Sequence, residues 1–456
     1  MQGGGSVAET LASPIVRGFL ALIAAALLVV LGRELRKIPP KLMVLMATAF
    51  MDMVGLLMVV PLLPFYVKKL GGEGVGFLGM HLGIGILSGV IASAFTVAQL
   101  LSSPMWGRFS DKFGRRPALL IALSAAGVAY LVFGFAESLW LLFLSRIVQG
   151  AGGGTVGVIQ AYVADTTEPE HRARNLGWLS AATNLGVALG PVVGAFAVVL
   201  GTKDLLPGSG ELRMGHAAPG IIAAMLCGIT IIFAWRYLKE SKTLVHQESE
   251  RRRPKEALLR VITHTAEPSS RLIWIYAIAI GAFQGTFPVL PLFLNSKFQV
   301  TEATIGYFFM YIGSISVFAR VLLLGKLVDR MGEARLSRFG LVLLALGLGT
   351  MPLAPNLPFL ALSVAMLPLG TAFTFPCVTA LLSRVINPAD RGLYMGLQQS
   401  FGGVSRIIAP LWAGFAFDTL GQGVPFFTAA LVVLGTISLG LGLDQYAKRP
   451  APVSAA

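Results

Sequence analysis

The chain has 456 residues, of which 55% are hydrophobic and only 13% charged, and its formal net charge is +14. About a quarter of the residues of a soluble domain are charged, so this composition excludes a soluble globular protein. Apolar runs of roughly 18 residues or more recur along the chain, and each could cross about 30 Å of hydrocarbon as a helix. Barrel strands are short and alternate in polarity, so the sequence predicts an all-α polytopic membrane protein.

The first apolar run covers residues 14–32 and lies in a segment, 1–40, that ends in a basic linker. A signal peptide is disfavoured, because Arg17 is a thin basic region and the main basic cluster follows the apolar run. The order of these features predicts an extra N-terminal helix that spans the membrane with its N-terminus outside. A helix that lies in the membrane interface is the alternative, and the sequence leaves both open.

Twelve further spans follow, separated into two sets of six by a long polar segment at 239–270. The pattern predicts an N-terminal six-helix bundle at 41–238, a linker at 239–270, a C-terminal six-helix bundle at 271–446 and a cytoplasmic tail at 447–456. The predicted spans are 41–66, 77–106, 117–137, 139–164, 172–201, 217–238, 271–295, 302–327, 333–355, 357–386, 389–419 and 423–446.

The distribution of basic residues predicts the orientation. If loop 107–116 is cytoplasmic, the loops on that side hold 27 of the 36 Lys and Arg residues, and the opposite loops hold six. Cytoplasmic loops of membrane proteins carry such an excess, so the net charge reflects topology and does not indicate a nucleic-acid partner. A cytoplasmic C-terminus follows, and a bacterial inner membrane is the expected location.

The two halves resemble each other. GRFSDKFG at 107–114 recurs as GKLVDRMG at 325–332, an offset of 218 residues. The segment 172–191 recurs at 391–410, where Arg172, Gly177 and Pro191 have matches at an offset of 219. Repeats of this kind are typical of secondary transporters, whose site lies at the interface between the halves.

The stretch GRFSDKFGRR concentrates charge between two apolar runs. Its basic residues serve orientation, but a lone carboxylate at Asp111 adds nothing to it. The stretch resembles the loop between helices two and three of the major facilitator superfamily, G-x-x-x-D-R/K-x-G-R-R/K. The residues that match are Gly107, Asp111, Lys112, Gly114, Arg115 and Arg116. This resemblance covers about 41–446 and implies the major facilitator fold, with two six-helix bundles related by pseudo-symmetry.

The family motif implies a conformational latch. Its Asp is thought to hold the two halves outward-open, and the N-terminus of the eleventh family helix, near 387–391, would attract the carboxylate of Asp111. Asp165 matches the acidic partner that the family places beside the motif's Arg. The resemblance therefore implies a charge network of Gly107, Asp111, Arg115, Arg116 and Asp165; solvated loop charges are the alternative.

A second resemblance points to one branch of this family. GVALGPVVG in the fifth family helix resembles the signature of drug:proton antiporters and comprises Gly186, Gly190, Pro191 and Gly194. Small residues at this spacing let helices approach closely and Pro191 would bend the span, so ordinary helix packing is the alternative.

Two ionisable residues are predicted inside spans of the first half. Arg146 in RIVQG resembles the R-x-x-Q-G motif of the fourth family helix, which the family links to proton transfer; a structural Arg bound to carbonyls is the alternative. Asp52 is the one carboxylate that the sequence places deep in a span. A carboxyl group in a low dielectric can titrate near neutral pH, as proton coupling requires, although a permanently neutral Asp52 would also fit.

The substrate cavity is expected to contain Asn184, Gln284 and Arg406. These features predict a proton-coupled antiporter, a monomer without cofactor or metal, that exports amphipathic organic molecules or drugs by alternating access. A transporter of lysophospholipids or other anionic lipids is the alternative that Arg406 favours, since a cation at mid-membrane would suit an anionic head group. A receptor without transport activity is a third reading; an enzyme is not expected.

Overall fold

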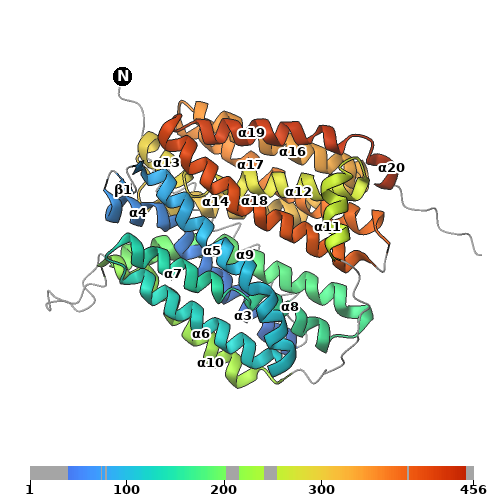
Figure 1. Ribbon diagram of the computed structural model, residues 1–456, viewed down its shortest axis with the longest axis horizontal. Helices are drawn as coiled ribbons and strands as arrows, with labels where there is room; N and C mark the ends of the chain where they lie inside the picture. The colour runs from blue at the N-terminus through green and yellow to red at the C-terminus, as the bar shows by residue number, and fades with distance from the viewer. Residues whose placement is uncertain are drawn as a thin grey trace, which may run out of the picture. The chain divides into compact units, whose positions relative to one another are not determined.

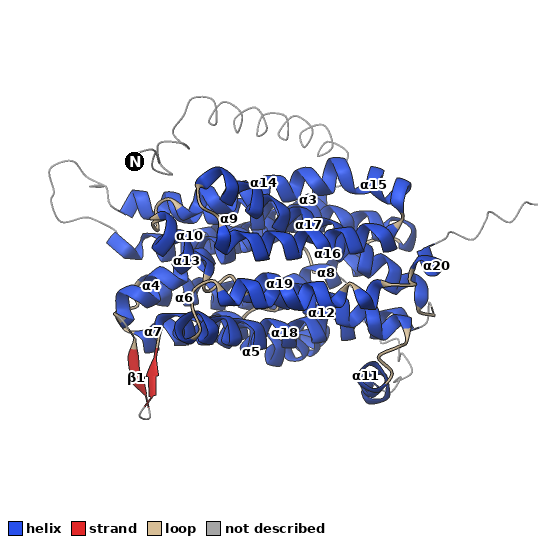
Figure 2. Cartoon of the chain, turned by 90° about the horizontal axis from the view of Figure 1, so that it is seen from above, coloured by secondary structure: helices blue, strands red, loops and turns tan. Residues whose placement is uncertain are grey.

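A computed structural model describes residues 40–72, 74–77, 80–201, 215–240, 254–387 and 390–447 (Figure 1). The extra helix expected at 14–32 lies outside these residues. Nearly all of the described chain is helical, as Figure 2 shows.

Helices in the first part of the chain follow the predicted spans. They are α3 (Pro40–Val59), the 3₁₀ turn η1 (Val60–Leu62), α4 (Leu63–Gly71), α5 (Ile84–Phe113), α6 (Arg115–Gly134), α7 (Leu139–Ala151), α8 (Thr155–Thr166), α9 (Pro169–Gly201), the 3₁₀ turn η2 (Gly215–Ala217) and α10 (Ala218–Tyr237).

The second part contains the remaining helices. They are α11 (Pro254–Thr263), α12 (Pro268–Gly285), α13 (Leu290–Phe298), α14 (Ile305–Phe318), the π-helical η3 (Ala319–Leu323), α15 (Leu324–Met331), α16 (Glu333–Thr350), η4 (Met351–Leu353), α17 (Leu357–Val385), α18 (Arg391–Thr419), α19 (Val424–Thr436), η6 (Ser438–Gly440) and α20 (Asp444–Ala447).

Among the described residues, eight helices are long and apolar enough to cross a membrane, and the number is nine if α12 and α13, with a bend of 43° between them, are counted as one broken span. The predicted span 139–164 is divided into α7 and α8 at Gly152–Gly154. Within the expected linker 239–270, α11 and the first residues of α12 are helical.

The predicted span 77–106 was misplaced at both ends. Strands β1 (Val75–Phe77) and β2 (Met80–Leu82) form an antiparallel hairpin, so α5 begins only at Ile84. At its other end α5 continues through the charged stretch to Phe113, and the turn consists of Gly114 alone, whose φ is +102°. The charged residues can continue the helix beyond the apolar part of the span. The helix ends at Gly114, because glycine tolerates a positive φ.

Contacts divide the chain into two compact units that do not follow chain order. One unit runs to Ile84 and includes Ala94–Val245 and Pro291–Gly313; the other contains Gly85–Ser93, His246–Leu290 and Ser314–Ala456. The first turns of α5 therefore belong to the second unit, and the first turns of α14 to the first unit. The predicted halves at 41–238 and 271–446 stay a prediction about the pseudo-symmetry of the chain.

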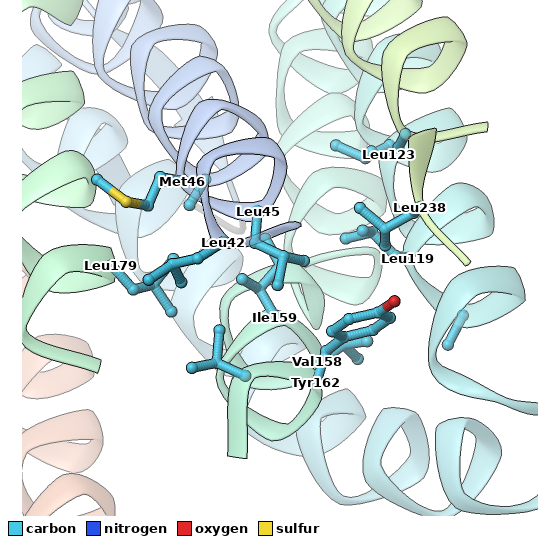
Figure 3. Close-up of a cluster of buried hydrophobic side chains, with 14 residues drawn as sticks. Leu42, Leu45, Met46, Leu119, Leu123, Val158, Ile159, Tyr162, Leu179 and Leu238 are labelled. Atoms are coloured by element: carbon cyan, nitrogen blue, oxygen red, sulfur yellow. The ribbon is translucent and has the colours of Figure 1, made fainter. Parts of the chain in front are cut away.

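In the first unit, α3 packs against α9 and α10, and α6 packs against α10. Leu42 and Leu45 of α3, Leu119 of α6 and Ile159 of α8 belong to one buried apolar cluster, which Figure 3 shows. These residues come from three helices, so burial of their side chains joins the helices at this end of the unit.

In the second unit, α16 packs against α17 and α19, and α12 packs against α18. The three helices α16, α17 and α19 lie side by side in Figure 1. Leu336 of α16 and Phe373 of α17 belong to the buried cluster there.

Candidate functional site

Asp52 lies in the second half of α3 and is only 6% exposed. Its Oδ2 accepts a hydrogen bond from the hydroxyl of Thr155, at 2.6 Å. Thr155 is 4% exposed and is the first residue of α8, directly after the glycines that separate α7 from α8. The sequence did not reveal Thr155 as a partner of Asp52; the only signal was its place after the run Gly152–Gly154.

Arg146 lies in α7 and is 2% exposed. Its guanidinium carbon is 5.0 Å from the centroid of the Phe133 ring, and its Nε donates to the Ser145 hydroxyl at 3.4 Å. Its Nη2 has no hydrogen-bond partner among the described residues. No ion pair between described residues joins Arg146 to Asp52, although both lie in the first unit. The structure thus buries both residues predicted for proton coupling but gives them separate partners.

The end of α5 carries the charge network that the family motif implies. The Arg115 guanidinium contacts Asp111 through Nη1 at 2.6 Å and Asp165 through Nε at 2.9 Å. The Arg115 side chain is 17% exposed, whereas that of Asp111 is 61% exposed. Asp111, Arg115 and Asp165 are therefore in contact, and their part in any conformational change stays a prediction.

Arg116 and Glu240 complete the contacts at this end of the unit. One carboxylate oxygen of Glu240 accepts from the backbone N–H of Arg115 at 2.7 Å, and the other accepts from that of Arg116 at 3.3 Å. The Arg116 side chain donates to the carbonyl oxygen of Trp235 at 2.5 Å. Glu240 thereby caps the N-terminus of α6, where an anion is favourable. Glu240 was not expected from the sequence, in which its one signal is its position just after the sixth predicted span.

The two glycines of the motif differ in their surroundings. A Cβ atom on Gly114 would lie 2.6 Å from the Glu240 carboxyl carbon, and the positive φ of Gly114 also favours glycine. A Cβ atom on Gly107, within α5, would meet nothing within 4 Å. The turn and the cap explain Gly114, and no packing contact explains Gly107.

A related pair occurs in the second unit, with its charges exchanged. Arg384 of α17 contacts Glu333 of α16, with a closest approach of 2.5 Å. The repeat offsets of 218 and 219 align Glu333 with Arg115 and Arg384 with Asp165. The pair was not expected from the sequence, because an exchange of charge keeps the ion pair while both residue types change, and the repeat then shows no matching residues at these positions.

The antiporter motif lies in α9, on the side that faces α3. A Cβ atom on Gly186 would lie 2.5 Å from the Phe50 carbonyl oxygen, and one on Gly190 would lie 2.7 Å from the Leu57 Cβ. Gly194 approaches the backbone of Met58 in the same way. Pro191 lies inside α9, which continues as a helix on both sides of it. These glycines permit the close approach of α3 and α9.

The three residues expected in the substrate cavity do not all lie in one unit. Gln284 and Arg406 belong to the second unit and are half-buried; Arg406 forms no ion pair with another described residue. Asn184 belongs to the first unit, where its amide donates to the Ser180 carbonyl at 2.7 Å. Their role in binding stays a prediction.

Apolar helices of membrane-spanning length, a buried carboxyl group and a buried arginine define the class of polytopic membrane transporters. The chain belongs to the Major Facilitator Superfamily, whose family model matches residues 45–332 and 272–455. This match confirms the resemblance, the predicted fold class and the prediction of a transporter rather than an enzyme.

Known relatives extend over most of the chain. "Multidrug resistance protein 2" of Bacillus subtilis (strain 168) is 26% identical over 408 residues, which are 88% of this chain and 94% of that protein. "Tetracycline resistance protein, class C" of Escherichia coli is 28% identical over 382 residues, 81% of this chain and 88% of that protein. The crystal structure of a bacterial homolog to the human lysosomal transporter Spinster, in an inward-facing and occupied conformation, has a TM-score of 0.72 at 13% identity. The match to this structure covers 91% of this chain and 100% of that chain.

Proposed function

We propose that the protein exports amphipathic organic molecules by proton-coupled antiport. The resistance proteins named above supply the substrate class, since both are named for the drugs against which they protect. The drug:proton antiporter signature in α9 supports exchange rather than co-transport. The protein would work as a monomer in a bacterial inner membrane, with its C-terminus in the cytoplasm, as the distribution of basic residues indicates.

The observation that carries this proposal is the environment of Asp52. A charged carboxylate is costly inside a membrane and its presence there points to a function. Asp52 is buried within a span, and its one hydrogen-bond partner among the described residues is the Thr155 hydroxyl. A carboxyl group in that position can take up a proton in one conformation and release it in the other. Arg146, buried in the same unit, supplies the positive charge that would favour release if the two side chains approach each other.

The charge network at the end of α5 supports a part in alternating access. In the part of the chain that the structure describes, Asp111 forms an ion pair with Arg115 only, and most of its side chain is exposed, so it can exchange partners at small cost. We expect Asp111→Asn to weaken the outward-open state that the family motif implies. Cysteine labelling from the side opposite the network should then fall relative to the wild type, and unchanged labelling would leave these charges with a role in topology only.

Replacement of Asp52 tests the proposal. Asp52→Asn keeps the shape of the side chain and removes its proton, so drug transport driven by a pH gradient in proteoliposomes should be lost while drug binding persists. Glu137→Gln, at an exposed carboxyl group between α6 and α7, is the control and should transport like the wild type. Full gradient-driven transport by the Asp52→Asn variant would contradict proton coupling at this residue.

A second candidate function rests on Arg406. This half-buried cation in α18 has no ion pair among the described residues, and an anionic lipid or other anionic amphiphile would neutralise it. In that case Arg406→Ala should weaken binding of anionic substrates by about 2–5 kcal/mol and spare neutral and cationic ones. A uniform loss for all substrates, with a lower melting temperature, would identify Arg406 as structural and leave the drug exporter as the remaining candidate.

A further inference from the structure

The break between α7 and α8 is stabilised by side chains of α5. The Trp106 indole donates to the Ala151 carbonyl at 2.6 Å, and the Gln99 amide donates to the Gly153 carbonyl at 3.3 Å. The Ser102 hydroxyl also donates to a carbonyl at this point, that of Gly150. Carbonyl groups that lose their helical partners at the break therefore find new donors, which makes the break a defined part of the fold.

At the break, neighbouring groups leave too little space for a side chain on the glycines. A Cβ atom on Gly152 would lie 2.9 Å from the Ala125 Cβ, and one on Gly153 would lie 2.9 Å from the Gln99 amide nitrogen. Larger residues would push the chain away from α5 and α6. The glycines thus allow α8 to begin in the interior of the unit, and Thr155, its first residue, reaches Asp52.

A cavity of about 30 Å³ adjoins the Thr155–Asp52 hydrogen bond. Asp52, Tyr130, Gln149, Gly153 and Thr155 are among the residues that line it. A water molecule needs about 10–15 Å³ of such space, so the cavity has room for at least one water and is too small for an organic substrate.

Gln149, which lines this cavity, has a buried side-chain oxygen that needs a hydrogen-bond donor. The residue is 3% exposed, and its Oε1 has no hydrogen-bond partner among the described residues. A buried acceptor without a donor is costly, and a water molecule in the adjoining cavity would supply the missing donor. The first residue of α8, Asp52 and Gln149 thus supply polar groups to one small cavity whose lining is otherwise largely apolar.

We propose that this cavity binds one water molecule between Asp52 and Gln149, and that Thr155 is the residue that positions the carboxyl group for proton exchange. While Asp52 is ionised, the water donates one hydrogen to the carboxylate and the other to Gln149 Oε1. When Asp52 is protonated, its O–H donates to the water oxygen, and the Thr155 hydroxyl still donates to Oδ2. The same contacts serve both protonation states, as a reversible proton site requires; this inference rests on the proposed proton coupling at Asp52.

Other ionisable groups of the unit also act on Asp52. Tyr130 of α6 lines the cavity, and the neutral thiol of Cys227 of α10 lies near Asp52. The positive charge of Arg146 of α7 interacts electrostatically with Tyr130. A test must therefore separate the effects of Thr155 and the water from those of these three residues. Substitution of Thr155 leaves their contacts in place, whereas Gln149→Leu also removes the side-chain hydrogen bond between Gln149 and Tyr130, so Met53 is the cleaner reporter of the water.

Radiolytic hydroxyl labelling tests the water directly, because bound water yields radicals that oxidise the side chains beside it. Met53 and Tyr130 line the cavity, so both should be labelled in the wild type, and Gln149→Leu should reduce their labelling several-fold. Gln398→Leu is the matched control, since Gln398 is also a buried glutamine with an unpartnered atom but lies in the second unit. Wild-type labelling of Met53 and Tyr130 at background level, or equal labelling in the Gln149→Leu variant, would overturn the water site.

The pH profile of drug-induced proton release tests Thr155. Thr155→Val keeps the shape and removes the hydrogen bond to the ionised carboxylate, so the profile should move to higher pH by about one unit. Thr155→Ser should restore the wild-type profile. Identical profiles for the valine and serine variants would refute a positioning role. Proton release that persists in the Asp52→Asn variant would instead refute the proposed function, so the two failures are distinguishable.

Discussion

Glu302 lies in the short segment between α13 and α14, outside the spans. Burial raises the pKa of its carboxyl group above the ordinary value of 4.5, and the nearby charges of Lys69 and His216 lower it in part. The folded protein therefore binds a proton at Glu302 over a pH range in which the unfolded chain has already released it.

This shift predicts a pH dependence of stability. Because the pKa of an acid is higher in the folded state, its contribution to stability is fully present below pH 4.5 and is lost as the pH rises through the folded-state pKa. Glu302→Gln keeps the neutral form at every pH, so the melting temperature of this variant should fall less than that of the wild type between about pH 4.5 and neutrality. Glu137→Gln, at an exposed carboxyl group, is the control. Parallel curves for the Glu302→Gln variant and the wild type would contradict the shift.

At the scale of helices, α5 begins without a cap of its own. Its N-cap residue, Gly83, has no side chain, and the N–H groups of Gly85 and Ile86 donate to Asp418 of α18 at 3.0 and 2.8 Å. Both donors and the acceptor belong to the second unit. A residue 333 positions away thus satisfies the first turn of α5.

We expect Asp418→Ala to lower the free energy of unfolding by about 1 kcal/mol, the usual effect of removing a cap. Asp418→Asn should lose less, because its one amide oxygen can still accept a hydrogen bond from α5. Thermal unfolding of the two variants in the same detergent measures the difference. Equal melting temperatures for the alanine variant and the wild type would show that water replaces the carboxylate at no cost.

Two glycines of α9 offer a matched test of helix packing. A Cβ atom on Gly190 would lie 2.7 Å from the Leu57 Cβ, whereas one on Gly177 would meet nothing within 4 Å. Gly190→Ala should therefore destabilise the protein by about 1–3 kcal/mol through overpacking against α3. Gly177→Ala should be neutral or stabilise the helix by about 0.5–1 kcal/mol. A stable Gly190→Ala variant would indicate that α3 can move away from α9 without loss.

For the molecule as a whole, the repeat is expressed in ion pairs as well as in sequence. Arg115 contacts Asp165 in the first unit, and Glu333 contacts Arg384 in the second. The positions match through the repeat offset while the signs are exchanged. Both repeats therefore contain an ion pair at this place, although the residue types differ. This indicates that the repeats require the contact and not a particular residue at either position.

A double-mutant cycle tests this interpretation. Glu333→Arg should destabilise the protein, because two arginines would then face each other, and Arg384→Asp should do the same with two carboxylates. The double variant recreates the arrangement of Arg115 and Asp165 and should recover stability, with a coupling energy of about 1 kcal/mol, since Arg384 is partly exposed. Additive losses, measured by thermal unfolding, would show that the second pair depends on more than its charges.

The sequence by itself determined the membrane class, the family and the residues of the charge network. Long apolar runs admit only spanning helices, and the loop motif needs charged groups at a fixed spacing of four residues, which places Asp111 beside Arg115 on any helix. The burial of Asp52 followed from its place deep within an apolar run. These properties depend on neighbours along the chain, whereas Asp165, 50 positions from Arg115, was expected only from the family resemblance.

Only the tertiary structure decided which distant groups complete these sites. Thr155 contacts Asp52 across 103 positions, and Glu240 caps α6 across 125. Neither contact leaves a periodic signal, because hydrogen bonds between helices depend on how the helices pack rather than on local spacing. The hairpin at Val75–Leu82 and the break at Gly152–Gly154 were hidden for a related reason: both lie in apolar, glycine-rich sequence that a hydropathy pattern reads as continuous span.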